Sequence, residues 1–431
     1  MLARDLAGWL AYVERQHPQT IALGLERVAQ VRDVLSDRFA LALPMPIIIV
    51  GGTNGKGSTC AMLESILRAA GYRVGCYTSP HLLRYNERVR VDGREADDAT
   101  LAAAFARVEA ARGDTPLTYF EFGTLAAAVV FAEAKLDALV LEVGLGGRLD
   151  AVNIFEPDCA IVTSVGLDHM DYLGDTREKI GWEKAHIFRA GKPAICGDPD
   201  PPITLIEHAA SIGAELQVIG RDFDYVDQEQ QWQYRGRAGQ RSGLPYPALR
   251  GARQLANASV VLAALEGLRE RLPVSAQAVR EGLLAVELAG RFQVLPGRPM
   301  VILDVAHNPH AAAVLAENLD RIESNVKGRM IAVFGMLADK DIAGVVRCLR
   351  GRIDRWHAAT LSGPRGTRAD MLAEIIAREQ PWAEVARFDS PSAAYAAARA
   401  LAGPDDKILA FGSFLTVTDV LSAIGEGKAG R

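Results

Sequence analysis

Short apolar runs alternate along the chain with longer segments in which apolar residues recur at helical spacing. In the first half, four runs are typical of strands buried on both faces, at 46–50, 136–143, 158–165 and 192–196. Helical spacing appears among them, at 56–71, 99–113 and 122–136. Strands that alternate with helices predict an α/β fold with a mostly parallel sheet covered on both faces.

The stretch 223–250 interrupts this rhythm. It is polar, aromatic and rich in turn residues, which predicts a small antiparallel excursion, and helical patterns follow at 255–272 and 275–286. A second α/β series has apolar runs at 299–305, 329–336, 353–360 and 407–413. Because the turn-forming "LPGRP" precedes that series, we predict two domains, 1–294 and 295–431.

Composition and charge narrow the class of protein. The length of 431 residues fits two or three domains, and the net charge of −5 argues against a nucleic-acid partner. The five cysteines are scattered without a C-x-x-C pair, which favours reduced thiols over a disulfide framework or a zinc site. The N-terminal residues carry charges throughout, and no apolar run approaches about 20 residues. We therefore expect a cytoplasmic protein with no membrane partner.

The segment "GGTNGKGST" (51–59) follows the first predicted strand and opens a predicted helix. It differs from the usual P-loop spacing, because Gly57 separates Lys56 from Ser58. Glycines permit the turn, backbone N–H groups at a helix start bind anions, and Lys56 can reach terminal phosphates. A plain strand–turn–helix connection is the alternative. The order of strand, glycines, lysine and hydroxyls favours a phosphate loop.

Three further residues are candidates for chemistry. Glu142 ends an apolar strand directly before a glycine turn, where α/β sheets place ligands, and its carboxylate suits Mg²⁺. The alternative for Glu142 is a solvated strand end. Taken alone, His169 is more typical of a structural histidine and Lys184 of a helix surface.

The loop "GTNGKGS" resembles the ATP loop of the Mur ligase superfamily, and most closely that of its folylpolyglutamate and dihydrofolate synthase family. Further segments resemble that family in order across essentially the whole chain, at 23–28, 77–93, 118–124, 141–153, 163–174, 183–195, 290–292 and 303–312. The form "TYFEFGT" (118–124) resembles the bifunctional bacterial members, which perform two ligations.

The resemblance implies a two-domain Mur-ligase-like fold, with a P-loop ATPase domain followed by a smaller Rossmann-like domain. It implies an ATP-dependent amide ligase that activates a substrate carboxylate as an acyl phosphate, which the amine of L-glutamate then attacks. The implied small-molecule partners are ATP as co-substrate, dihydropteroate, reduced folates and L-glutamate. Two Mg²⁺ sites and a monomer are also implied.

The resemblance also assigns site residues. The implied catalytic residues are Lys56, Glu142, His169 and Lys184. Metal ligands would be Ser58, Glu142, His169 and Lys184, the last as a carbamate. ATP contacts would come from Asn54, Gly55, Lys56, Gly57, Ser58, Asn257, Arg291 and Asp304. The pterin side would comprise Gly24, Leu25, Thr118, Tyr119, Phe120, Glu121, Leu149, Asp150 and Ala151, and the glutamate side His307 and Ser413.

Two positions depart from the family pattern. Ala22 stands where the family often has an aspartate, which removes a polar contact to the pterin. His186 replaces the glycine that usually follows the Lys184 segment, which bears on local helix packing.

Several alternatives compete with this interpretation. A monofunctional folylpolyglutamate synthase would share the same site, so the sequence does not separate it. A cell-wall Mur ligase is disfavoured, because only about one long helix and a connector precede the loop. A GTPase would need N-K-x-D, and a dinucleotide oxidoreductase G-x-G-x-x-G after its first strand. A non-catalytic P-loop regulator would be expected to lack Glu142, His169 or Lys184.

Overall fold

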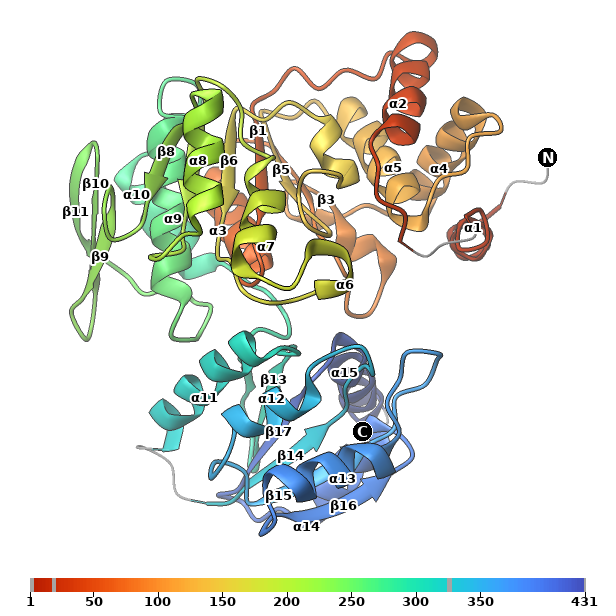
Figure 1. Ribbon diagram of the computed structural model, residues 1–431, viewed down its shortest axis with the longest axis vertical. Coiled ribbons are helices and arrows are strands. Elements are labelled where there is room, and N and C mark those ends of the chain that lie inside the picture. The colour runs from red at the N-terminus through yellow and green to blue at the C-terminus, as the bar shows by residue number, and fades with distance from the viewer. Residues whose placement is uncertain (1–3, 18–20, 324–327, 430–431) are drawn as a thin grey trace. The chain divides into compact units, whose positions relative to one another are not determined.

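The computed structural model describes residues 4–17, 21–323 and 328–429 (Figure 1). The chain forms two compact units. Unit 1 comprises Met1–Ala248 and Leu255–Val286, and unit 2 comprises Leu249–Gln254 and Glu287–Arg431. The change of unit therefore falls after Val286 and not after residue 294 as expected from the turn signal. The reason is that strand β12 (Gln293–Leu295) pairs with β13 (Met300–Asp304).

Unit 1 is built on an eight-stranded sheet in the order β4-β3-β2-β5-β1-β6-β7-β8. The strands are β1 (Ile47–Gly51), β2 (Val74–Tyr77), β3 (Val89–Val91), β4 (Arg94–Glu95), β5 (Ala138–Glu142), β6 (Cys159–Val162), β7 (Pro193–Cys196) and β8 (Glu215–Val218). Pairing is parallel from β2 to β8, whereas β3 and β4 run antiparallel at one edge. The predicted mostly parallel sheet is confirmed, and β1 lies between β5 and β6.

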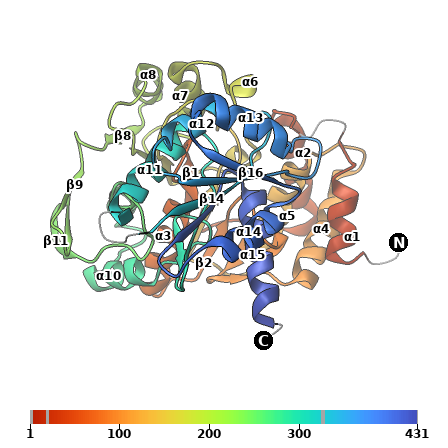
Figure 2. The ribbon, with the colours of Figure 1, turned by 90° about the horizontal axis from the view of Figure 1, so that it is seen from below.

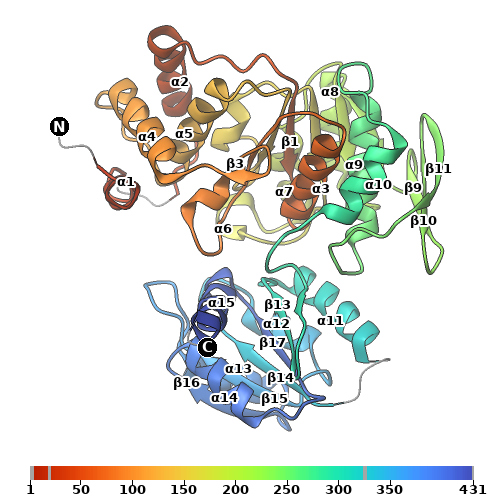
Figure 3. The same ribbon diagram turned by 180° about the vertical axis from the view of Figure 1, so that it is seen from behind.

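Helices cover both faces of this sheet. In Figure 1, α7 and α8 lie in front of the strands, whereas α3 and α10 lie in front in the reverse view of Figure 3. The helices are α1 (Leu6–Val13), α2 (Glu26–Phe39), α3 (Lys56–Ala69), α4 (Asp98–Arg112), α5 (Tyr119–Glu133), α6 (Met170–Leu173), α7 (Arg177–Ala185), α8 (Ile203–Ile212), α9 (Gln254–Gly267) and α10 (Ala276–Ala285). Two short 3₁₀ helices are η1 (Tyr85–Arg88) and η2 (Ala151–Ile154). Before the loop, the described residues 4–17 and 21–50 hold two helices, α1 and α2, where about one long helix was expected.

The polar stretch after β8 forms a separate three-stranded antiparallel sheet in the order β11-β10-β9 (Figure 1), as predicted. Its strands are β9 (Asp224–Asp227), β10 (Trp232–Gly236) and β11 (Gly239–Leu244). Trp232 and Tyr234 are fully buried, so alternate residues of β10 anchor this small sheet.

Unit 2 has a six-stranded sheet in the order β12-β13-β17-β14-β15-β16, parallel except for β12. Its remaining strands are β14 (Met330–Phe334), β15 (Arg355–Ala359), β16 (Glu384–Phe388) and β17 (Lys407–Phe411). Figure 2 shows α11, α12 and α13 on one face and α14 and α15 on the other. These helices are α11 (Pro309–Glu323), α12 (Ile342–Cys348), α13 (Ala369–Glu379), α14 (Pro391–Leu401) and α15 (Phe414–Ala429). The second α/β series is confirmed.

Each unit buries a core of its own on these sheets. Strands β1 and β14 are buried along their whole length, as expected for central parallel strands. In the described part of the chain, no helix has both the length and the apolar character that crossing a membrane requires.

Helix α10 packs against the phosphate-loop helix α3 at Gly282. A Cβ atom there would lie 2.4 Å from the Cα of Ile66, and the Ser65 hydroxyl donates to the Gly282 carbonyl at 2.8 Å. Gly282→Ala should therefore force the helices apart and lower the free energy of unfolding by about 1–3 kcal/mol. Urea unfolding followed by circular dichroism measures this change.

Gly425→Ala is the matched control, because no heavy atom lies within 4 Å of the Cβ it would add to α15. That change should leave stability unaltered or raise it by up to about 1 kcal/mol, from helix propensity alone. Equal effects of the two substitutions would contradict the steric account of Gly282.

Candidate functional site

The phosphate loop connects β1 to α3 and leaves no room for side chains at two of its glycines. Gly52 has φ +138, and a Cβ there would lie 1.9 Å from the Thr163 hydroxyl oxygen. Gly55 has φ +91, and its Cβ would lie 2.7 Å from the Asn257 side-chain oxygen. The loop therefore approaches the end of β6 on one side and α9 on the other. This approach places Asn257, an expected ATP contact, beside Gly55.

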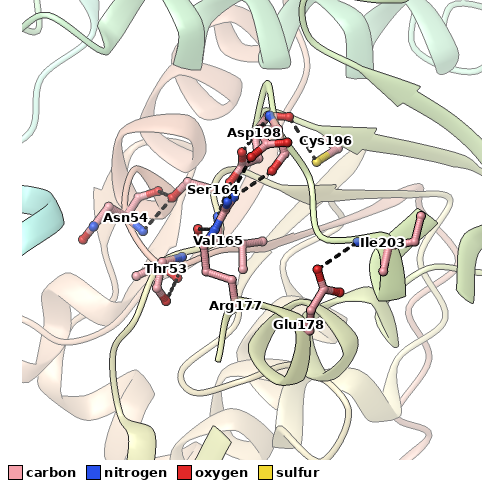
Figure 4. A network of polar contacts seen from close by, with 11 residues as sticks. Thr53, Asn54, Ser164, Val165, Arg177, Glu178, Cys196, Asp198 and Ile203 are labelled. Carbon is pink, nitrogen blue, oxygen red and sulfur yellow. Dashed lines mark hydrogen bonds and ion pairs between the residues drawn. The ribbon is translucent and has the colours of Figure 1, made fainter. Parts of the chain in front are cut away.

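Hydrogen bonds fasten the loop to the residues that follow β6 (Figure 4). Thr53 N donates to the Ser164 carbonyl at 2.8 Å, and Asn54 N to the Ser164 hydroxyl at 3.1 Å. The Thr163 hydroxyl donates to the Asn54 carbonyl at 2.7 Å. Lys56 folds its ammonium back onto the loop, 3.1 Å from the Gly52 carbonyl. A helix start with ordered backbone N–H groups and a nearby lysine suits phosphate oxygens.

The expected oxygen ligands for a cation lie on the neighbouring strand and in the first turn of α3. Glu142 ends β5 opposite Val50 of β1, is 4% exposed, and accepts a hydrogen bond from Ser79 N at 2.9 Å. Ser58 is buried in the first turn of α3. A carboxylate and a hydroxyl are the hard donors that Mg²⁺ prefers, so the donor set fits that ion.

Lys184 is not the surface lysine that its position in a helix pattern predicts. It is 4% exposed near the end of α7, and burial followed by the charge of Lys56 lowers its pKa to about 7. The charges of Asp168 and Asp150 oppose this shift. These electrostatic interactions group three charged residues from three other segments around one buried amine.

The glycine turn after β5 explains how α7 comes so close. A Cβ on Gly147 would lie 2.8 Å from the Glu183 carbonyl oxygen and 3.1 Å from the Lys184 Cα. Arg148 N donates to that carbonyl at 2.9 Å, and its guanidinium pairs with the Glu183 carboxylate at 2.9 Å. Asp150 in the same turn accepts from Leu145 N at 2.8 Å, and burial raises its pKa to about 6.

His169 and His186 lie at the ends of short helical segments. His169 precedes α6 with φ +50, and its N–H donates to the Asp168 carboxylate at 2.9 Å. The charge of Asp168 also acts on Lys184, so the loop that carries His169 lies near that lysine. His186, the departure from the family pattern, follows α7, and its ring stacks on His208 of α8 at 3.9 Å between centroids. The substitution leaves α7 continuous through Lys184.

The expected pterin side joins three segments of unit 1. Thr118 caps α5 and Glu121 completes a capping box, while the Glu121 carboxylate also pairs with Arg27 at 2.9 Å. Arg27 donates to the carbonyl of Ala22 at 2.9 Å. The Phe120 ring lies where a Gly144 side chain would be, with ring atoms 2.6 Å from that Cβ position. Glu121 is thus held in structural contacts, whereas the turn that carries Leu149, Asp150 and Ala151 lies beside Phe120.

Unit 2 brings its four expected residues together around Phe414. Asp304 ends β13, is paired with β17, and accepts from Phe292 N at 2.9 Å and Ala306 N at 2.7 Å. Burial raises the pKa of Asp304, and the charge of Arg291 opposes the shift. The Arg291 guanidinium lies 5.0 Å from the Phe414 ring centroid, and the His307 ring lies 6.4 Å from it. Ser413 is buried immediately before that phenylalanine.

Sequence reasoning missed the residues that connect the loop to α7. Asp198, buried after β7, accepts from Val165 N at 2.8 Å and from the Arg177 guanidinium at 3.1 Å (Figure 4). Arg177 is the first residue of α7 and also donates to the Val165 carbonyl at 3.1 Å. Their signal was available, because polar residues that follow adjacent parallel strands meet at one edge of a sheet.

Comparison with known proteins agrees with the fold of each unit. Residues 50–219 match the family model of the Mur ligase middle domain, and residues 290–414 that of the Mur ligase glutamate ligase domain. The dihydrofolate synthase/folylpolyglutamate synthase of Escherichia coli is 47% identical over 429 residues, covering 99% of this chain and 97% of the relative.

Solved structures are similar along the whole length. E. coli FolC in complex with DHPP and ADP matches with a TM-score of 0.93 and 47% identity, covering 99% of both chains. A bifunctional folylpolyglutamate synthase/dihydrofolate synthase with Mn, AMPPNP and L-glutamate bound matches with a TM-score of 0.88 and 47% identity, covering 98% of both chains.

Asp198→Asn should weaken the connection between the phosphate loop and α7. An amide of the same shape presents N–H groups to donors and removes the charge opposite Arg177, so unfolding should cost about 1–3 kcal/mol less. We also expect weaker binding of an ATP analogue. Urea unfolding and calorimetric titration measure the two effects.

Asp200→Asn is the control, because Asp200 also contacts Arg177, at 3.3 Å, but its side chain is 92% exposed. Its effect on both measurements should be negligible. If Asp200→Asn lowered the free energy of unfolding as much as Asp198→Asn, burial of Asp198 would not explain its contribution to stability.

Proposed function

Because this chain belongs to the dihydrofolate synthase/folylpolyglutamate synthase family of Mur ligases, we propose that it ligates L-glutamate to dihydropteroate and to tetrahydrofolate. Each ligation consumes ATP and releases ADP and phosphate. The substrate carboxylate displaces ADP from the γ-phosphorus to form an acyl phosphate. The glutamate amine then adds to the acyl carbon, phosphate leaves, and the amine loses a proton. The observation that carries this proposal is the phosphate loop with Lys56 and Glu142 at one edge of the sheet, within a full-length match.

For the nucleotide, we propose that the backbone of residues 54–58 and the Lys56 ammonium hold the phosphates. Asn257 lies beside Gly55. Ser58 and Glu142 would hold one Mg²⁺, and His169 and Lys184 a second. A divalent cation bound there neutralises phosphate charge. Arg291 and Asp304 of unit 2 would contact the nucleotide, and His307 and Ser413 the incoming glutamate. Together these groups would position the reactants and stabilise phosphate charge, which is the main catalytic requirement of phosphoryl transfer.

We further propose that Lys184 acts as a carbamate. Carbon dioxide adds to a neutral amine, with a new N–C bond and loss of one proton, so an amine that is neutral near pH 7 is a suitable acceptor. Burial lowers the pKa of Lys184 to about 7, in support of this chemistry. The product is an anionic oxygen donor, which suits Mg²⁺ better than an ammonium does.

The pterin-bearing substrate would contact Gly24, Leu25, Thr118, Tyr119, Phe120, Leu149, Asp150 and Ala151. Glu121 would act through the capping box and Arg27 and not as a direct ligand. Arg27 also donates to the backbone carbonyl of Ala22, a contact that does not depend on the side chain at that position. We also propose that the protein works as a cytoplasmic monomer.

Phosphate release with MgATP and L-glutamate tests the two ligations. We expect release with dihydropteroate and with tetrahydrofolate, each with a mass increase of one glutamyl residue in the product, and none without a pterin substrate. Release with tetrahydrofolate alone would identify a monofunctional folylpolyglutamate synthase. Absence of substrate-dependent release in every arm would count against the ligase proposal and favour a P-loop regulator.

Replacing Lys184 tests the carbamate. Lys184→Ala should lower kcat by at least about a hundredfold, and added acetate should restore part of it by supplying a carboxylate oxygen. Lys184→Arg should be equally impaired and insensitive to acetate, because the longer cation fills the space. As a readout independent of activity, ¹³C NMR in ¹³C-bicarbonate should show a carbamate resonance that Lys184→Ala abolishes.

Lys179→Ala is the matched control on the same helix, since Lys179 is 62% exposed and paired with Asp175. It should keep both the activity and the resonance. A carbamate signal of equal intensity in Lys184→Ala would reject Lys184 as the modified residue.

A further inference from the structure

The segment between β2 and β3 carries an arginine that differs from its neighbours. Arg84 pairs with Glu95 at 2.9 Å, and Arg90 pairs with Glu64 at 2.8 Å. Arg88 lies between them in sequence and is half-buried, yet within residues 4–17, 21–323 and 328–429 it forms no ion pair with Asp or Glu. A half-buried guanidinium without a carboxylate is electrostatically incomplete, which points to an anionic ligand.

Arg88 is nevertheless held firmly in place. Its Nε donates to His81 Nδ1 at 2.8 Å, and its guanidinium lies 5.4 Å from the Tyr85 ring centroid and 5.5 Å from that of Tyr119. Burial, with the charge of Arg88, lowers the pKa of His81 to about 4, so that ring is a neutral acceptor at physiological pH. The Nε–H of the Arg88 guanidinium is taken up by His81. The remaining N–H groups of the guanidinium have the bidentate geometry that matches a carboxylate.

Glycine at position 123 explains why the Tyr85 ring stays under Arg88. A Cβ there would lie 2.5 Å from the Tyr85 hydroxyl oxygen, so only glycine admits this buried ring. Tyr85 also packs edge-on against Tyr119, at 6.0 Å between centroids. The arginine therefore has a preorganised aromatic support, which reduces the entropy lost when it binds a ligand.

The position of Arg88 relates it to the proposed active site. Thr78 N donates to the Arg88 carbonyl at 3.0 Å, and the next residue, Ser79, donates its N–H to Glu142. Tyr119, which faces the guanidinium, is adjacent to Phe120, whose ring lies against Gly144. Arg88 is thus fixed near the carboxyl end of the parallel strands, where Glu142 lies. It rests on the aromatic wall of the expected folate site, which is formed by the rings of Tyr85 and Tyr119.

We propose that Arg88 binds the α-carboxylate of the glutamate that a reduced folate already carries. This inference rests on the proposed function. In that substrate the γ-carboxylate reacts, while the α-carboxylate is a second anion that takes no part in the chemistry. Dihydropteroate has only the carboxylate that reacts. Arg88 is therefore a specificity residue for the second ligation, and its contribution to the first is small.

The test compares the two ligations in Arg88→Gln. We expect KM for tetrahydrofolate to rise about tenfold to a hundredfold, which is the loss of a charge-assisted hydrogen bond, and KM for dihydropteroate to change far less. Arg84→Gln is the matched control, because Arg84 lies on the same segment but is exposed and paired with Glu95. It should leave both KM values close to those of the parent protein.

A substrate analogue makes the assignment specific. Tetrahydropteroyl-γ-aminobutyrate keeps the reacting carboxylate but lacks the α-carboxylate. With the unaltered protein its KM should exceed that of tetrahydrofolate by the same factor as Arg88→Gln causes. With Arg88→Gln the two substrates should have nearly equal KM values, because the contact has already been lost. Arg88→Lys, which keeps the charge, should retain part of the preference.

Three results would overturn the proposal. Equal losses with both natural substrates would mean that Arg88 binds the reacting carboxylate or supports the segment. Unchanged KM for tetrahydrofolate in Arg88→Gln would mean that Arg88 binds no substrate anion. Equal KM values for tetrahydrofolate and the analogue in the unaltered protein, which needs no folded variant, would exclude any α-carboxylate site. Failure of the proposed function is distinguishable, since the unaltered protein would then ligate neither natural substrate.

Discussion

The close approach of the phosphate loop to the end of β6 is the constraint on which the rest of unit 1 depends. Any side chain at Gly52 would overlap the Thr163 hydroxyl, so the loop lies flat against that strand end. Val165, which follows the same strand, donates its N–H to Asp198. Asp198 also accepts from Arg177 at the start of α7. Helix α7 carries Lys184. One strand therefore sets both the phosphate loop and the buried lysine, so neither moves independently of the other.

This arrangement concentrates charge in a poorly solvated region. Burial moves the pKa of Lys184 down to about 7 and that of Asp150 up to about 6, in both cases toward the neutral form. Isolated buried charges destabilise a fold unless they are paired or titrate to neutrality. Both shifts reflect the cost of burying these two charged groups in unit 1. Phosphates, a carbamate and divalent cations would complete the charge balance, so stability is sacrificed for a site organised in advance.

The sequence was sufficient for the features that depend on local pattern. Apolar runs located β1, β5, β6 and β7, and the order of glycines and lysine located the phosphate loop. It was insufficient wherever a contact joins distant segments. Lys184 reads as a surface residue until the close approach of Gly147 is known, and Asn257 reaches Gly55 from a helix about two hundred residues later. The predicted boundary came from the turn signal at 295–299, whereas the change of unit follows Val286, directly after α10. The resemblance to a family supplied Lys184 and Asn257, for which no local pattern exists.

One site that performs two ligations faces a constraint on recognition. The groups that act on the reacting carboxylate cannot distinguish the two substrates, because each substrate presents a single carboxylate to them: the benzoate carboxylate of dihydropteroate or the γ-carboxylate of the folate's glutamate. Discrimination must come from side chains that meet the parts in which the substrates differ, namely the glutamyl portion of the reduced folate. The segment between β2 and β3 is suited to this, since its backbone is anchored at Glu142 while its side chains project along the aromatic wall of α5. Catalysis and substrate specificity can therefore be altered separately. Residues at the strand ends determine catalysis, and residues of the segment between β2 and β3 determine specificity.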